Sequence, residues 1–357
     1  MKALILIGGQ GTRLRPLTCN TPKAMVPILN RPFLEYLLQY LKQHGVSEAV
    51  LAMGYLPGPV RDYLGDGAAL GLKVHYLVED TPLGTAGAVK NAEAYLDETF
   101  LVFNGDIVTG IDLSDMLRRH RDAGPRVTIA LTPVEDPSAY GVVETDGRGL
   151  VRRFIEKPPP GTAASNMINA GIYIIEPEVL RSVPPATFFM FERDLFPLLL
   201  ARGEPMLAYP SHAYWIDIGT PEKYLKVNHD LLLQAPGTVL AAPGSIHPSA
   251  AVTAPALIGP GTIIGEGAAV AGPTVIGPDC EIGPGARVEA CVIWRGARIG
   301  RNACVEKSVI GFDAVVEDGG RVPEGCILAD RVRVGWGARL TPGTRIAPDT
   351  CAGQDGG

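Results

Sequence analysis

A glycine-rich loop near the start of the chain carries the residue types that bind phosphate. It reads Gly8-Gly9-Gln10-Gly11-Thr12-Arg13 and directly follows the apolar run 3–7. Glycine lets successive backbone N–H groups face an anion, and the guanidinium of Arg13 adds a planar positive fork. Leu14 stands where a dinucleotide fingerprint has its third glycine, and no Gly-Lys-Ser/Thr P-loop follows. The loop by itself predicts an anion site without specifying the ligand.

Two aspartates that end apolar stretches are candidates for a metal site. Asp106 follows the run 100–103 and the pair Asn104-Gly105, and Asp217 follows Ile216. Because the carboxyl ends of parallel strands meet at one edge of a sheet, both carboxylates could lie at the same rim. Hard carboxylate oxygens suit Mg²⁺, which also binds phosphate oxygens. From these residues alone, either aspartate could instead be a helix cap or turn residue.

The overall charge restricts the class of partner. The chain has 357 residues, with 32 Lys and Arg against 38 Asp and Glu, for a net charge of −6. Nucleic-acid binding depends largely on basic patches that neutralise phosphates, so this balance argues against a nucleic-acid binder. A small anionic substrate held by a few local cations remains compatible with it.

Strands and helices alternate over the first two thirds of the chain. This alternation predicts a Rossmann-like α/β domain, with a mostly parallel sheet covered by helices on both faces. A helix at 34–41 should end at Gly45, and another should open at Thr220-Pro221-Glu222 and run to Leu233. A third helix is expected at 84–92. The expected strands lie at 3–7, 49–53, 74–78, 100–103, 127–131, 141–144, 151–155, 171–175 and 206–209.

The last third of the chain is a repeat of six-residue units. An aliphatic residue recurs at this period, with two five-residue steps, and glycine or another small residue usually lies nearby. This pattern predicts a parallel β-helix of six coils, each with three short strands and one inward aliphatic per strand. The eighteen inward positions are Ile246, Val252, Ile258, Ile264, Val270, Ile276, Ile282, Val288, Ile293, Ile299, Val305, Ile310, Val316, Val322, Leu328, Val334, Leu340 and Ile346.

Two domains follow from these patterns, at residues 1–236 and 237–357. Glycine is denser after the boundary, where the aromatic residues are reduced to Trp294, Phe312 and Trp336. The chain contains no run of ~18 apolar residues that could span a membrane, and its first apolar run is too short for a signal peptide. The expected location is therefore the cytoplasm, with no membrane partner.

The extended glycine loop resembles the signature of the sugar-1-phosphate nucleotidyltransferases. The family pattern G-x-G-T-R-L-x-P-L-T-x-x-x-P-K is matched at every fixed position from Gly9 to Lys23. Several subfamilies also carry a left-handed hexapeptide β-helix after the catalytic domain. Further family blocks follow in order: Leu83-Gly84-Thr85-Ala86-Gly87, Asn104-Gly105-Asp106, Glu156-Lys157-Pro158, Asn169-Ala170-Gly171 and Trp215-x-Asp217-x-Gly219.

The resemblance implies an enzyme that joins a nucleoside triphosphate to a sugar 1-phosphate and releases pyrophosphate. The glycine loop (Gly8, Gly9, Gly11 and Thr12) and Arg13 would hold the triphosphate, with Lys23 near its α-phosphate. Lys157 would bind the sugar phosphate. Arg13, Lys23, Asp106 and Asp217 would be catalytic, the two aspartates through Mg²⁺. Glu156, Asn169 and Gly171 would contact the sugar and Gly141 would let it approach, although each of these four could be a structural turn residue.

The nucleobase is predicted from the segment around Glu79 and Gly84, both assigned to nucleotide binding. The Leu-Gly-Thr-Ala-Gly form resembles the mannose-1-phosphate guanylyltransferases of the family. The guanine edge offers two adjacent donors, which a carboxylate such as Glu79 accepts together. Glu79 could equally be a solvated charge at a strand end. GTP is preferred, mannose follows from the resemblance alone, and a glucose-1-phosphate thymidylyl- or uridylyltransferase is the alternative.

The sequence is also compatible with two other functional classes. A hexapeptide acyltransferase needs a general base, usually histidine, and the repeat contains only His247. A non-catalytic regulatory homologue would have lost catalytic side chains, whereas Arg13, Lys23 and Asp106 are present. The β-helix is expected to be a scaffold that packs on the first domain, assembles the chain into a homo-oligomer, or carries a regulatory surface.

Overall fold

A computed structural model gives the structure of the chain and describes residues 1–234 and 246–353. Its contacts divide the chain into two compact units. The first unit holds Met1–Gln10 and Leu34–Asp217, and the second holds Gly11–Phe33 and the chain from Ile218 onward. The second unit therefore includes an N-terminal segment. The predicted domain boundary near residue 236 falls at 235–245, outside the described residues.

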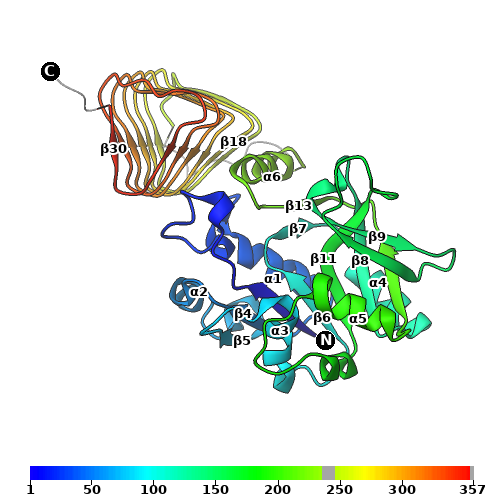
Figure 1. The fold of residues 1–357 in the computed structure, drawn as a ribbon. Coiled ribbons are helices and arrows are strands. Elements are labelled where there is room, and N and C mark those ends of the chain that lie inside the picture. Colours follow the sequence, from blue (N-terminus) through cyan, green and yellow to red (C-terminus); the bar gives the residue numbers. More distant parts are fainter. Residues whose placement is uncertain (235–245, 354–357) are drawn as a thin grey trace. The chain divides into compact units, whose positions relative to one another are not determined.

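The first unit is built on a nine-stranded sheet (Figure 1). The strand order is β10-β9-β11-β6-β1-β4-β5, with β8 on β11 and β12 on β8. Strands β10 and β11 run opposite to the other seven, so the expected mostly parallel α/β sheet is confirmed. The strands are β1 (Lys2–Ile7), β4 (Glu48–Met53), β5 (Lys73–Val78), β6 (Phe100–Asn104), β8 (Val127–Pro133), β9 (Gly141–Thr145), β10 (Val151–Glu156), β11 (Met167–Ile175) and β12 (Met206–Pro210).

The helices of the first unit cover a sheet whose central strand is buried on both sides. Ala3, Leu4 and Ile5 are consecutive in β1 and all 0% exposed. Since successive strand residues point to opposite faces, neither face of β1 reaches solvent. The α-helices are α1 (Phe33–Gln43), α2 (Pro57–Leu64), α3 (Gly84–Asn91), α4 (Leu113–Ala123) and α5 (Phe196–Ala201). Shorter turns are η3 (Ala68–Leu70), η4 (Glu93–Tyr95), η5 (Pro137–Ala139), η6 (Pro177–Ser182) and the π-helical η7 (Phe191–Leu195).

Helix α1 shows how the local sequence determines an element and its end. Leu34, Leu37, Leu38 and Leu41 recur at helical spacing and are all buried. The helix ends where Gly45 adopts a left-handed φ of 82°. The N–H of Gly45 bonds to the carbonyl of Lys42, and that of Val46 to the carbonyl of Leu41. This double closure is a Schellman motif, for which glycine is the preferred residue.

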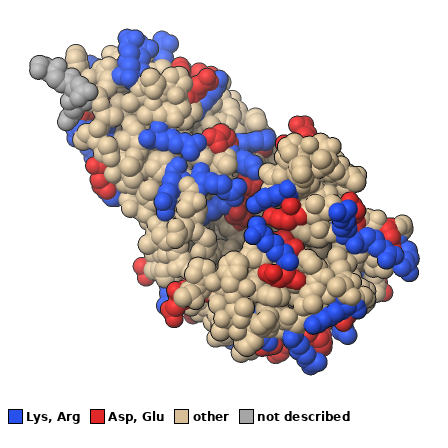
Figure 2. Space-filling view, in the orientation of Figure 1, with Lys and Arg blue, Asp and Glu red and all other residues tan. Residues whose placement is uncertain are grey.

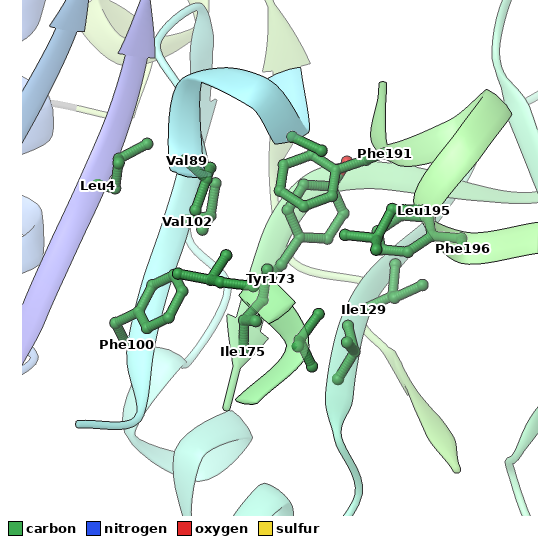
Figure 3. Packing of buried hydrophobic residues seen from close by; sticks show 14 of the residues in the cluster. Leu4, Val89, Phe100, Val102, Ile129, Tyr173, Ile175, Phe191, Leu195 and Phe196 are labelled. Atoms are coloured by element: carbon green, nitrogen blue, oxygen red, sulfur yellow. The ribbon is translucent and has the colours of Figure 1, made fainter. Parts of the chain in front are cut away.

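An aromatic cluster forms part of the core of the first unit (Figure 3). The rings of Tyr173, Phe191 and Phe196 lie 4.9–5.3 Å apart between centroids and are fully buried. Burial of side chains of this size stabilises the fold by about 2–3 kcal/mol each. Tyr173 belongs to β11, so this packing anchors the strand that carries Asn169-Ala170-Gly171.

The second unit contains the predicted β-helix, whose stacked strands form three parallel sheets (Figure 1). Of the eighteen predicted inward aliphatics, fifteen are buried in one core, and Ile246, Val252 and Leu340 pack against it partly exposed. The first sheet holds β14 (Ala251–Thr253), β17 (Ala269–Ala271), β20 (Arg287–Glu289), β23 (Cys304–Glu306) and β26 (Arg321–Val322). The second holds β15 (Ala256–Ile258), β18 (Thr274–Ile276), β21 (Val292–Ile293), β24 (Val309–Ile310), β27 (Ile327–Leu328) and β29 (Arg345–Ile346). The third holds β16 (Ile263–Ile264), β19 (Glu281–Ile282), β22 (Arg298–Ile299), β25 (Val315–Val316), β28 (Arg333–Val334) and β30 (Cys351–Ala352).

The remaining elements of the second unit are helix α6 (Pro221–Gln234) and the segment 11–33. The segment contains the short 3₁₀ turns η1 (Thr12–Leu14) and η2 (Lys23–Met25). It ends in a two-residue hairpin between β2 (Pro27–Ile28) and β3 (Arg31–Pro32). No helix within residues 1–234 or 246–353 has both the length and the apolar character needed to cross a bilayer.

Candidate active site

The two aspartates lie at neighbouring backbone positions of a short two-stranded sheet in the first unit. Strands β7 (Ile107–Thr109) and β13 (Trp215–Asp217) pair antiparallel, with Asp217 opposite Ile107, the residue after Asp106. Asp217 is 9% exposed and Asp106 is half-buried. The hydroxyl of Tyr140 donates a hydrogen bond of 2.9 Å to Oδ2 of Asp217. The sequence placed neither β7 nor β13, because strands of three residues have no readable period.

The donor atoms around the aspartates fit a magnesium ion. Both groups are hard carboxylates, and Asn104, two residues before Asp106, has a buried Oδ1 with no hydrogen-bond partner. Among the described residues, no three or more His, Cys, Asp or Glu side chains are grouped so that they could hold a metal ion by themselves. A site with two carboxylates suits Mg²⁺, which commonly takes its remaining ligands from substrate phosphates and water.

Gly141 and Glu156 are direct partners across the β9–β10 pair. A Cβ atom at Gly141 would lie 2.7 Å from the ring of Phe154 and 3.0 Å from Oε2 of Glu156, so a larger residue would force these side chains to move. The N–H of Lys157 bonds to the carbonyl of Tyr140 at 3.0 Å. Lys157 itself has a φ of 48°, a conformation that side chains other than glycine rarely adopt and that often marks a functional position. Its Nζ lies 3.7 Å from Oε1 of Glu156 and its side chain is 60% exposed.

Asn169 and Gly171 lie where the register of β11 shifts against β8. Gly171 has a φ of 71°, and a Cβ there would come within 2.5 Å of Nδ2 of Asn104. The Gly171 N–H donates to Oδ1 of Asn169 at 2.9 Å. Nδ2 of Asn169 donates to the hydroxyl of Tyr173 at 2.7 Å and to Oε1 of Glu192 at 3.4 Å. Both amide hydrogens are thus occupied within the protein, so Asn169 can offer a sugar hydroxyl an acceptor but no free donor.

Glu192, which no sequence motif singles out, lies next to Asn169 in this site. Its Oε1 also accepts from the hydroxyl of Tyr173 at 3.3 Å, while its Oε2 is buried without a hydrogen-bond partner. Burial raises the pKa of the Glu192 carboxyl above its ordinary value. Nothing in the sequence around Glu192 indicates that its carboxylate accepts hydrogen bonds from Asn169 and Tyr173. Tyr140 was also missed as a partner of Asp217, although it directly precedes Gly141.

Glu79 and the first glycines of the loop follow parallel strands that end at the same edge of the sheet. Gly8 and Gly9 follow β1, Glu79 follows β5, and Asp106 lies just beyond β6. Oε2 of Glu79 accepts the N–H of Leu83 at 3.1 Å, and burial raises the pKa of the carboxyl. Gly84 has a φ of 72°, and a Cβ there would lie 2.7 Å from the carbonyl oxygen of Phe189. Glycine is therefore required at position 84 for packing, whatever its part in nucleotide binding.

Gly11, Thr12, Arg13 and Lys23 belong to the second unit. Gly11 has a φ of 61°, and its carbonyl accepts the hydroxyl of Thr18 at 2.8 Å. A Cβ at Gly11 would lie 3.3 Å from the Cβ of Lys23, so the glycine lets the loop fold closely onto that lysine. Thr12 and Arg13 are exposed and Lys23 is half-buried.

Two family models match the chain. The nucleotidyl transferase model matches residues 2–234, and the model of the EIF2B subunit epsilon LbH domain matches residues 241–340. The first match spans most of the chain and includes all the candidate site residues. The second covers much of the hexapeptide repeat.

Individual relatives agree with these matches. A mannose-1-phosphate guanylyltransferase of Mycobacterium tuberculosis is 37% identical over 85% of this chain and 83% of its own length. A mannose-1-phosphate guanylyltransferase catalytic subunit beta of Danio rerio is 38% identical over 94% of this chain and 92% of its own. The crystal structure of HddC from Yersinia pseudotuberculosis complexed with GMP-PN is 33% identical, with a TM-score of 0.56 over 64% of this chain and 99% of HddC. With the signature loop, the sheet and these relatives in agreement, the chain belongs to the nucleotidyl transferase family.

Proposed function

We propose that this chain is a mannose-1-phosphate guanylyltransferase, which converts GTP and mannose 1-phosphate to GDP-mannose and pyrophosphate. An oxygen of the sugar phosphate attacks the α-phosphorus of GTP, and the bond from that phosphorus to the β-phosphate oxygen breaks. The observation that carries the proposal is the Tyr140–Asp217 hydrogen bond beside the Gly141–Glu156 pair. It brings a carboxylate suited to metal binding close to groups suited to a sugar phosphate within one unit.

Catalysis of this reaction depends on positioning and on neutralising two polyanions. Arg13 and the amides of Gly8, Gly9, Gly11 and Thr12 bind the triphosphate, and Lys23 neutralises charge that develops at the α-phosphate and the leaving group. Lys157 binds the sugar phosphate through its exposed ammonium group. Glu156 accepts hydrogen bonds from sugar hydroxyls, Asn169 offers an acceptor beside it, and the glycines Gly141 and Gly171 keep the backbone open to the ring.

Mg²⁺ is the metal that Asp106 and Asp217 would hold. Bound there, it would neutralise phosphate charge as a Lewis acid. Tyr140 orients the Asp217 carboxylate by donating a hydrogen bond to Oδ2.

GTP is preferred over the other nucleotides for two reasons. Glu79, with Gly84 beside it, can accept the two adjacent donors of the guanine edge, and thymine or uracil offers no such pair. In addition, the relatives named above are guanylyltransferases by name, and the HddC structure is described as a complex with GMP-PN. The relatives' names are the support for mannose.

The test is pyrophosphate release from a matrix of four nucleoside triphosphates and several sugar 1-phosphates, with Mg²⁺. The highest kcat/KM is expected for GTP with mannose 1-phosphate. A clear preference for dTTP or UTP with glucose 1-phosphate would replace the proposed substrates. If no pair of substrates releases pyrophosphate, the proposed activity is refuted. Light scattering of the same sample tests the homo-oligomer proposed from the β-helix.

A further inference from the structure

The segment that carries Arg13 and Lys23 ends in a strained hairpin turn. Ile28 pairs with Arg31, and the two residues between them, Leu29 and Asn30, have φ values of 46° and 66°. Two consecutive positive φ values define a type I′ turn, which usually contains glycine or asparagine. A branched side chain such as leucine is disfavoured there, and such a conformation persists only where the surroundings enforce it.

Side chains and backbone of the second unit hold this turn from two sides. The N–H of Leu29 donates to Oδ1 of Asn228 at 3.0 Å, and Nδ2 of Asn30 donates to the carbonyl of Ile276 at 2.8 Å. Asn228 lies on α6, is 0% exposed, and donates from Nδ2 to the carbonyl of Tyr224 at 2.9 Å. Ile276 belongs to β18 of the β-helix. The turn is therefore fixed both to the helix and to a coil of the repeat.

A second connection runs through two buried aromatic side chains. The hydroxyl of Tyr224 donates to the carbonyl of Pro27, and Nε1 of Trp294 donates to the same hydroxyl at 2.9 Å. Trp294 is 1% exposed and Tyr224 is 0% exposed. A buried polar atom that loses its hydrogen-bond partner destabilises the folded state, so these hydrogen bonds favour one arrangement of the three residues. It links the β-helix, α6 and the strand that follows η2.

Trp294 occupies a corner of the β-helix where the neighbouring coils have glycine. Ile276, Ile293 and Ile310 are register partners, so Gly277, Trp294 and Gly311 occupy equivalent corners. The indole of Trp294 packs against Phe312 on the next coil, with 4.6 Å between ring centroids. Since glycine forms this corner in both neighbouring coils, the β-helix does not need a tryptophan there to make the turn. The indole adds an N–H donor that reaches Tyr224.

We propose that Trp294, Tyr224 and Asn228 are positioning residues for the nucleotide-binding segment. Pro27 lies four residues after Lys23, and the intervening Ala24 and Val26 are buried at 4% and 0% exposure. Fixing Pro27 and the turn at 29–30 therefore restricts where Lys23 and the loop before it can lie. The β-helix thus holds the triphosphate-binding segment in position. This role rests on the function proposed above for Arg13 and Lys23.

The test compares Tyr224→Phe and Trp294→Phe with Trp336→Phe in the full-length chain. Both test variants keep an aromatic ring and remove one polar group, whereas Trp336 is 80% exposed and serves as the matched control. Hydrogen exchange of peptides covering 11–33 and of peptides covering the β-helix is followed by mass spectrometry. KM for GTP, KM for mannose 1-phosphate and kcat are measured on the same samples.

Loss of the hydrogen bonds should speed exchange in peptides covering 27–33 at least about threefold and raise KM for GTP about five- to tenfold. KM for mannose 1-phosphate and exchange in the β-helix should match the control. Unchanged exchange at 27–33, or faster exchange there with an unchanged KM for GTP, would overturn the proposal. Faster exchange throughout the β-helix would also overturn it, since the residues would then be only structural. A wild-type chain that turns over no nucleotide would instead refute the proposed function, and would do so before any variant is examined.

Discussion

The hydroxyl of Tyr140 lies 2.9 Å from Oδ2 of Asp217 and donates a hydrogen bond to it. This one bond connects two groups of candidate residues in the first unit. Asp217 is opposite Ile107 and therefore next to Asp106, while Tyr140 precedes Gly141, the strand partner of Glu156. A tyrosine that no motif singled out thus joins the carboxylate pair to the residues proposed for the sugar phosphate.

Tyr140→Phe should lower kcat about tenfold, because the Asp217 carboxylate loses a hydrogen-bond donor that orients it. The dependence of rate on Mg²⁺ concentration should shift to higher concentration in the same variant. The control is Tyr209→Phe, which removes a tyrosine–aspartate hydrogen bond of the same 2.9 Å length, to Asp115. Equal kinetic effects in both variants would contradict a specific role for Tyr140.

Asp106→Asn should abolish Mg²⁺-dependent turnover and leave the fold intact. The amide keeps the size of the side chain but removes the charge that favours a divalent cation. Circular dichroism and pyrophosphate release measure the two properties on one sample. Asp122→Asn, on the exposed face of α4, provides the control. Near-wild-type activity in Asp106→Asn would remove this residue from the metal site.

Lys157→Ala should raise KM for mannose 1-phosphate by about tenfold or more, since a charge-assisted hydrogen bond to phosphate is lost. The affinity for GTP alone, measured by calorimetry, should change little. Arg153→Ala removes an exposed cation from β10, the strand that directly precedes Lys157, and should leave both parameters unchanged. If both substrates lost affinity equally, the assignment of Lys157 to the sugar phosphate would be wrong.

Glu79→Gln should reduce kcat/KM for GTP roughly tenfold and narrow the preference for GTP over UTP. A carboxylate accepts hydrogen bonds from both guanine donors, whereas a carboxamide has one acceptor oxygen and faces the second donor with a donor of its own. The loss of this bidentate pair should reduce the discrimination between bases by about 1–3 kcal/mol. Asp80→Asn changes the charge at the exposed neighbouring position and controls for a general electrostatic effect. An unaltered ratio of GTP to UTP activity would show that Glu79 does not recognise the base.

Glu192→Gln should raise the melting temperature relative to wild type, by an amount that grows with pH. Burial raises the pKa of Glu192 above 4.5 in the folded state, so the unfolded chain loses this proton first as pH rises. Wild-type stability from this group is therefore complete below pH 4.5 and falls until the pH passes the raised pKa. Melting curves between about pH 5 and 8 measure the difference. Glu178→Gln, at an exposed carboxylate, is the control, and a constant offset for Glu192→Gln would disprove the titration.

Much of the fold could be predicted because its signals are local in the sequence. The four buried leucines of α1 lie within about two turns, and Gly45 caps the helix. Each coil of the β-helix repeats the same inward aliphatic positions. The expected strands at 3–7, 49–53 and 100–103 correspond to β1, β4 and β6. Motif glycines at 84, 141 and 171 were visible too, although their packing partners were not.

The surface charge follows from composition in the same way. Lys and Arg are interspersed with Asp and Glu on the face shown in Figure 2. The net charge of the whole chain is −6. Recognition of a small anion requires only the few cations that the motifs specify.

The hexapeptide core, the α/β alternation and the phosphate-binding residue types can all be predicted from the sequence alone, since each depends on neighbours along the chain. Three relationships are visible only in the folded chain. Asp217 pairs with Ile107, the residue after Asp106, and the Asn169 amide donates to Tyr173 and Glu192. Residues 11–33 pack with α6 and the β-helix. These relationships join residues far apart in the chain. They depend on which strand ends and corners meet on folding, and no local period records that choice.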